Sequence, residues 1–242
     1  MALIDTQRQI LSLCFRQEPQ EDVLAVLGQR DKWLLYRELV RERLLREIRV
    51  ALPRTAALCT PQVLEDTFVW HLEHEPPRTR YFREVVRAYV ESAHKRWADD
   101  ARLHPACCDM ARYELALWDV ADLEAQLTGT VEEFAFDRVP VVSSALCLLE
   151  VSHAVHLPGE CAAGVHYLCV HRQHDAQRPR TWSLTKVTYE LLTQLCAGER
   201  TASEIVRQLA AAAGVRIDAG YLERVCETLA QFIEVGIVLG SR

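Results

Sequence analysis

Apolar side chains recur every three or four residues through the first half of the chain. Between Asp31 and Leu52 they alternate with arginine and glutamate, which is typical of an amphipathic helix. The same spacing runs over residues 61–72, 81–97 and 107–127, and in the last of these Glu114 falls among the polar positions that we expect to face solvent. Proline follows the first two stretches and ends a helix, because it lacks a backbone donor. We predict an all-helical domain over residues 1–130.

The pattern changes after Gly129 to short apolar runs rich in valine and bounded by proline and glycine. Such runs are typical of strands. They cover residues 139–157 and 164–172, and a polar loop then leads to a third short strand over residues 180–184.

Helical spacing returns after the third strand. A helix from Val187 stops at Gly198, which suits a helix C-terminus. Thr201 and Glu204 have capping-box spacing for the next helix, and Asp218 can begin the last one, which ends near Gly236. Three strands and three helices predict a winged-helix-like domain over residues 131–242, and an α+β chain as a whole.

The length and the net charge of the chain reduce the number of possible domain arrangements and function classes. The 242 residues exceed one average domain of about 150 residues, and with half of them hydrophobic they can form two cores. The formal net charge is -6. A nucleic-acid binder normally carries a basic surplus that neutralises phosphates, so we expect no nucleic-acid partner.

The chain start and the cysteines indicate a cytoplasmic protein. Met1 to Arg8 lacks a basic segment followed by an apolar run, and no later stretch stays apolar for the roughly 18 residues of a membrane helix. We therefore expect no membrane association. Nine cysteines are an odd number for a disulfide framework, and we interpret them as reduced thiols. Six sit among apolar neighbours, as small core residues do: Cys14, Cys59, Cys147, Cys169, Cys196 and Cys226.

Four stretches of the first half resemble the helical domain of HvfC-type proteins, whose family label refers to DNA binding. They are Tyr36-Arg37-Glu38-Leu39-Val40, Leu52-Pro53-Arg54-Thr55-Ala56-Ala57-Leu58, Glu75-Pro76-Pro77-Arg78-Thr79 and Met110-Ala111-Arg112-Tyr113-Glu114-Leu115-Ala116. Their order and spacing fit that domain too.

The second half, from Tyr167-Leu168-Cys169-Val170 through residues 191–201, is similar to small modules that recognise leader peptides of ribosomally made, modified natural products. The coenzyme PQQ chaperone is one relative. The two halves together resemble partners of multinuclear non-heme iron-dependent oxidative enzymes, including the methanobactin partner protein. The resemblance implies a heterodimeric adaptor in the biosynthesis of such peptides, one that binds both the iron enzyme and its precursor peptide.

The DNA-binding label conflicts with the charge of the helices. A helix that reads DNA offers Arg, Lys, Asn or Gln to base edges. The second C-terminal helix offers Arg207 and Gln208, and the third presents Glu223, Glu227 and Glu234. We interpret the winged-helix shape as a peptide-binding scaffold; the alternative is a winged-helix DNA-binding transcriptional regulator.

Peptide binding by such a module extends its sheet with an incoming strand and fills a groove against a helix. The predicted edge strand consists of Arg180, Thr181, Trp182, Ser183 and Leu184. The predicted groove wall is the last helix, with Leu222, Val225, Cys226 and Leu229. The alternative for the helix residues and Trp182 is ordinary core packing. Arginine on an edge strand also protects against aggregation.

No motif in the chain predicts catalysis, a metal or a cofactor. His71 and His74, His153 and His156, and His171 and His174 have two-residue gaps, but only the first pair shares a helical face. We expect surface or hydrogen-bonded histidines. There is no glycine-rich phosphate loop or serine nucleophile elbow, so we expect no enzyme activity of this chain. A metal-dependent enzyme remains the third hypothesis.

Two further segments have roles that the sequence pattern does not decide. The arginine-rich face of the helix over residues 31–52 is either a solvated face or a docking site for an acidic partner. Residues 2–30 fall outside the resemblance, and Ile10, Leu11, Leu13 and Phe15 favour an extra helix there.

Overall fold

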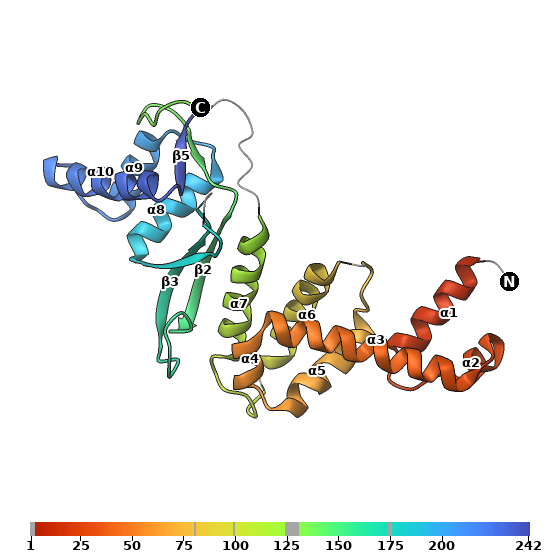
Figure 1. The fold of residues 1–242 in the computed structure, drawn as a ribbon. Coiled ribbons are helices and arrows are strands. Elements are labelled where there is room, and N and C mark those ends of the chain that lie inside the picture. Colours follow the sequence, from red (N-terminus) through yellow and green to blue (C-terminus); the bar gives the residue numbers. More distant parts are fainter. Residues whose placement is uncertain (1–2, 80, 99, 124–130, 174–175) are drawn as a thin grey trace. The chain divides into compact units, whose positions relative to one another are not determined.

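The chain consists of two compact units, Met1–Leu115 and Ala116–Arg242. The structure is a computed structural model that describes residues 3–79, 81–98, 100–123, 131–173 and 176–242 (Figure 1). Helices come first and a three-stranded antiparallel sheet with further helices follows, which confirms the predicted α+β class. The predicted boundary between the two domains lies after residue 130, and residues 124–130 are outside the described residues. No helix in the described ranges is long and apolar enough to cross a membrane.

The first unit is helical in its described residues. Its helices are α1 (Leu3–Phe15), α2 (Glu21–Leu27), α3 (Arg30–Ala51), α4 (Pro53–Leu58), α5 (Pro61–His74), α6 (Phe82–Trp97) and the beginning of α7 (Cys107–Asp122). The three predicted helices over residues 31–52, 61–72 and 81–97 are confirmed to within two residues. The fourth ends at Asp122, and residues 124–127 of its predicted span lie outside the described ranges.

The N-terminal extension forms two helices that pack on α3. Leu13 of α1 and Leu24 of α2 are buried, and Trp33 and Leu34 of α3 cover them. Arg37 donates from Nε to the Leu13 carbonyl at 3.0 Å and from Nη2 to the carbonyls of Arg16 and Gln17. A guanidinium there satisfies carbonyls that a helix leaves unpaired at its C-terminus. Part of the arginine-rich face of α3 therefore forms hydrogen bonds with the C-terminal end of α1.

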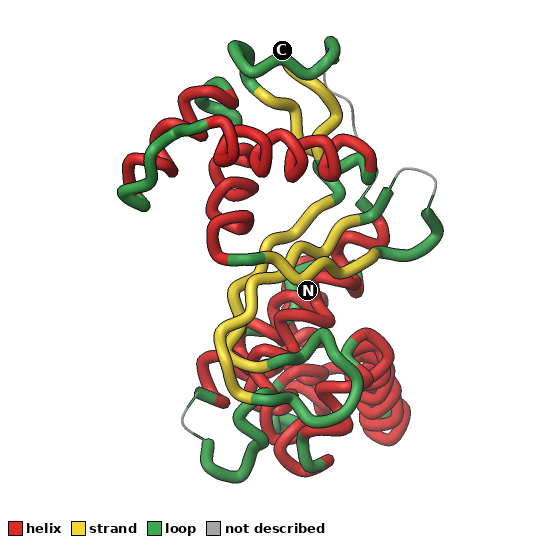
Figure 2. Tube along the Cα trace, turned by 90° about the vertical axis from the view of Figure 1, so that its left-hand side faces the viewer, coloured by secondary structure: helices red, strands yellow, loops and turns green. Residues whose placement is uncertain are grey.

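The second unit contains two antiparallel sheets. The larger has the order β2-β3-β4, and the smaller pairs β1 with β5. Their bounds are Pro140–Val142 (β1), Leu146–His153 (β2), Ala163–His171 (β3), Arg180–Leu184 (β4) and Val238–Ser241 (β5). Figure 2 shows the long β2–β3 hairpin with β4 beside it. The three-stranded sheet confirms the predicted strands, with the first predicted run divided into β1 and β2.

The C-terminal tail forms a strand that the sequence analysis did not predict. Pro140 of β1 pairs with Ser241 of β5, about a hundred residues further along the chain. Gly240 has a φ of 148°, and a Cβ there would lie 2.1 Å from the Glu132 carbonyl oxygen. Only glycine allows the backbone of Glu132 to approach the tail so closely.

Three helices cover the core of this unit: α8 (Lys186–Ala197), α9 (Ala202–Ala212) and α10 (Ala219–Glu234). Each begins at a side-chain cap, Thr185, Thr201 or Asp218. The capping box of Thr201 and Glu204 and the left-handed Gly198 after α8 confirm the sequence prediction. Buried side chains from β3, the three helices and the start of the tail form this core. They are Cys169, Leu191, Leu192, Leu195, Ile205, Leu229, Phe232, Ile237 and Val238.

Candidate functional site

The strand β4 lies at the edge of the three-stranded sheet. It pairs antiparallel with β3, and no second neighbour lies along it in the residues that the structure describes. Trp182 is opposite the buried Cys169, and Leu184 is opposite Tyr167. Because side chains alternate along a strand, Trp182 and Leu184 share the face that carries the helical core. One long edge of β4 therefore has no neighbouring strand among the described residues, and it lies beside side chains that face the helices.

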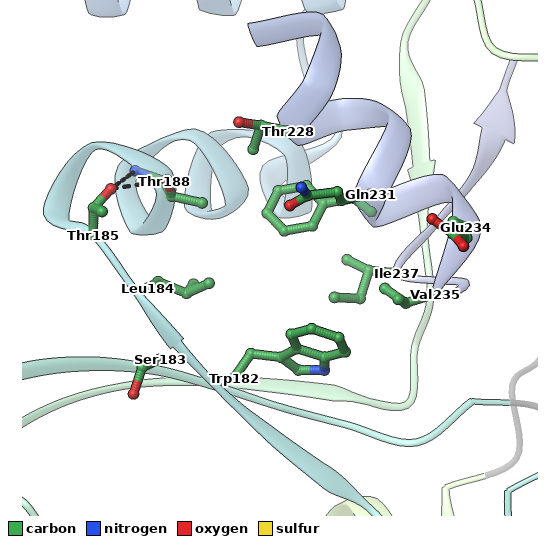
Figure 3. A pocket seen from close by; sticks show the side chains of 11 residues that line it. Trp182, Ser183, Leu184, Thr185, Thr188, Thr228, Gln231, Glu234, Val235 and Ile237 are labelled. Carbon is green, nitrogen blue, oxygen red and sulfur yellow. Dashed lines mark hydrogen bonds between the residues drawn. The ribbon is translucent and has the colours of Figure 1, made fainter. Parts of the chain in front are cut away.

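A cavity of about 420 Å³ lies between β4 and the C-terminal half of α10. In Figure 3, Trp182 and Leu184 point toward α10, whereas Ser183 points away from it. The lining combines these strand residues with the following loop, α8, α10 and the tail: Trp182, Ser183, Leu184, Thr185, Thr188, Thr228, Gln231, Phe232, Glu234, Val235 and Ile237. We call this cavity the strand groove. Trp182 is 39% exposed, so its indole can still contact a ligand.

The structure brings together only part of the predicted site. Trp182, Ser183 and Leu184 line the strand groove, whereas the neighbouring Arg180 and Thr181 do not. On α10 the lining begins at Thr228, about one turn beyond the predicted Val225.

Of the four predicted helix residues, Cys226 is exposed and does not line the strand groove, and the other three have different surroundings. Leu222 is 43% exposed and lines no cavity described here, and Leu229 is buried in the core. Val225 packs against the core and lines a second cavity. The sequence pattern did not identify Gln231, Phe232 and Val235 as lining residues, because helical spacing marks the apolar face of α10 but not the turn that lies against β4.

Ser183 is held on the opposite face of the sheet. Its hydroxyl lies 2.9 Å from Nε2 of His156, and the His156 ring lies 5.5 Å from that of His166. The contact orients the Ser183 side chain away from the strand groove. His156 thus has a structural hydrogen bond, as we expected of it.

Other histidines of the predicted pairs also have individual partners. Nδ1 of the buried His71 lies 2.8 Å from the Ser92 hydroxyl, and His74 stacks on Trp70 with ring centroids 4.5 Å apart. Within the described ranges no three His, Cys, Asp or Glu side chains are grouped to hold a metal ion.

A comparison with known protein families finds a match in the second unit. Residues 143–233 match the family described as the HvfC C-terminal domain. This part of the second unit is therefore similar to the HvfC C-terminal domain. The match extends from β2 to near the end of α10 and includes β4 and most of the helical wall of the strand groove. The match confirms a similarity to HvfC-type proteins; it lies in the second half of the chain, whereas the four stretches quoted for the resemblance lie in the first half. No curated protein matches the chain.

Proposed function

We propose that the chain is a non-catalytic cytoplasmic adaptor. It binds a ribosomally made precursor peptide and presents it to a multinuclear non-heme iron-dependent oxidative enzyme, with which it forms a heterodimer. The observation that carries the proposal is the position of β4 at the edge of the sheet, with no second neighbouring strand among the described residues, beside the strand groove. An incoming strand pairs its backbone with such an edge and places alternate side chains in the adjacent groove.

The groove chemistry favours a peptide over a nucleic acid. The indole of Trp182 and the side chains of Leu184 and Val235 are apolar, and Thr228 and Gln231 add polar groups. The acidic side chains of α10 are solvent-exposed, and they would repel phosphates: Glu223, Glu227 and Glu234. The winged-helix shape is, on this proposal, a scaffold for strand addition.

The first test is co-expression with an iron-dependent oxidase encoded beside the gene, with a purification tag on one protein. Co-purification at equal stoichiometry supports the adaptor. If no complex forms, with or without the precursor peptide, the adaptor fails. The transcriptional regulator then predicts binding to duplex DNA with steep salt dependence.

The second step measures precursor-peptide binding by the wild-type complex and by a Trp182→Ala complex. We expect about thirtyfold weaker binding, because truncation of a central aromatic anchor costs about 2 kcal/mol. Leu222→Ala is the matched control, since Leu222 is exposed and lies outside the strand groove. Equal affinity of the Trp182→Ala and wild-type complexes would remove Trp182 from the site.

A further inference from the structure

A second cavity, of about 380 Å³, lies between α8, α9 and α10. Apolar side chains from all three helices and the α9–α10 loop dominate its lining. The full set is Thr185, Val187, Thr188, Leu191, Val206, Leu209, Ala213, Val215, Tyr221, Arg224, Val225 and Thr228. We call it the helix pocket. Ligand pockets measure about 300–1,000 Å³, so this size suits one or two side chains rather than a whole secondary-structure element.

The helix pocket and the strand groove share part of their lining. Three threonines line both: Thr185, Thr188 and Thr228. Thr185 directly follows Leu184, the last residue of β4. A peptide paired with the edge of β4 and continuing past Leu184 therefore reaches the three threonines and then the helix pocket.

Two side chains of the helix pocket expose apolar surface. Val187 is 56% exposed and Val215 is 45% exposed. Burying such groups is favourable by roughly 25 cal/mol per Å² of apolar area, so a bulky apolar side chain gains free energy by covering them.

The two cavities also differ in charge. Arg224 lines the helix pocket, and Glu234 lines the strand groove. Neither side chain forms an ion pair within the described part of the chain. The arginine can therefore pair with a carboxylate of a ligand that occupies the helix pocket.

We propose that the peptide bound along β4 passes the three threonines and seats a bulky apolar side chain, next to an acidic residue, in the helix pocket. The inference rests on the proposed function and deepens it, because it adds a second anchor to the strand pairing. The recognised peptide thus has two parts: an alternating strand segment, and an apolar residue with an acidic neighbour at a fixed distance from that segment.

The test uses a phage-displayed library of random 16-residue peptides, selected on the full-length chain. Wild-type protein is expected to enrich both parts of the pattern. A Val187→Asp, Val215→Asp double variant should keep the strand segment, lose the apolar residue and bind the wild-type peptides at least tenfold more weakly. Arg224→Glu should exchange the acidic neighbour for a basic one. Ile233→Asp is the matched control, since Ile233 is 41% exposed and lines neither cavity.

The outcomes separate this inference from the proposed function. If the double variant binds the selected strand peptides as tightly as wild type, the helix-pocket anchor is wrong and the adaptor stands. If the double variant loses only co-purification with the oxidase, the pocket binds the enzyme and the inference is again wrong. If no peptide is enriched, or if the enriched peptides bind Trp182→Ala and wild-type protein equally, peptide binding at β4 itself fails. Thermal melting of each variant shows that it is folded.

Discussion

At the scale of single residues, Glu114 shows how a distant contact can change the role of a side chain. Its carboxylate accepts hydrogen bonds from the backbone N–H groups of Arg54 and Thr55, each at 2.8 Å, and from the Thr55 hydroxyl at 2.7 Å. These N–H groups lie in the first turn of α4, where a helix leaves its donors unpaired and favours a negative charge. The prediction that Glu114 faces solvent is wrong, because it is 5% exposed.

This contact joins two of the stretches that resemble HvfC-type proteins. Thr55 belongs to the stretch over residues 52–58, and Glu114 belongs to the stretch over residues 110–116. The two are far apart in sequence, but one caps the helix that the other forms. The two stretches are thus in direct contact in the folded unit.

His71 is the second residue whose role depends on burial. Its Nδ1 lies 2.8 Å from the Ser92 hydroxyl, which donates to Glu75 at 2.9 Å, and Glu75 in turn pairs with Lys95 at 2.8 Å. Burial lowers the pKa of His71 to about 4, and the nearby Glu75 carboxylate only partly opposes this effect. The imidazole is therefore neutral in the folded protein at neutral pH.

The lowered pKa predicts a loss of stability in acid. The unfolded chain binds a proton at His71 below about pH 6.5, and the folded chain does so only near pH 4, so stability falls between these values as the pH decreases. Between pH 7 and pH 4.5 this amounts to about 2–3 kcal/mol. We expect His71→Gln to lose that much less stability than wild type over the same interval, measured by urea unfolding. Equal losses in the two proteins would contradict a neutral, buried His71.

At the scale of elements, the helices of the second unit begin where their capping residues are. The Thr201 hydroxyl accepts from the Glu204 backbone N–H at 3.3 Å, and the Glu204 carboxylate accepts from the Thr201 backbone N–H at 2.9 Å. Asp218 caps α10 in the same way through the Tyr221 N–H. These bonds span three residues, which is why the sequence alone predicts them.

The capping box of α9 has a measurable contribution to stability. We expect Thr201→Ala to lower the free energy of unfolding by about 1 kcal/mol, because the first-turn N–H groups lose their acceptor. Thr201→Ser keeps the hydroxyl and should retain most of the stability. Urea denaturation followed by far-UV circular dichroism measures both. A Thr201→Ser variant as unstable as Thr201→Ala would show that the threonine methyl group, not the hydroxyl, is what α9 requires.

At the scale of the whole molecule, the nine cysteines are distributed between core and surface. All nine have free thiols in the structure. Cys14, Cys59 and Cys169 are buried as predicted, whereas the prediction of core positions for Cys196 and Cys226 is wrong, since both residues are exposed. Their apolar sequence neighbours point inward from α8 and α10, while these two residues lie on other sides of the helices.

This distribution predicts the order of thiol reactivity. Cys226 should react first with Ellman's reagent. Cys196 should follow more slowly, because local burial of its thiol raises its pKa to about 11 and the thiolate is the reactive form. The five buried thiols should react only on unfolding. Cys226→Ser should remove the fast phase, and Cys196→Ser should leave it. A fast phase that persists in Cys226→Ser would contradict the predicted exposure.

The sequence by itself determined the features that depend on neighbouring residues. Helical spacing predicted α3, α5 and α6, and short valine-rich runs predicted the strands of the larger sheet. Capping residues predicted where α9 and α10 begin. These signals act over three or four residues, so they can be read from a single chain.

Only the tertiary structure decided which distant groups meet. It paired β1 with β5, placed Glu114 at the start of α4, and set Gln231 and Val235 rather than Leu222 against β4. It also placed Thr185, Thr188 and Thr228 in the lining of both the strand groove and the helix pocket. Each of these arrangements depends on how whole elements pack around a shared core, and the periodicity of one element carries no information about the position of another.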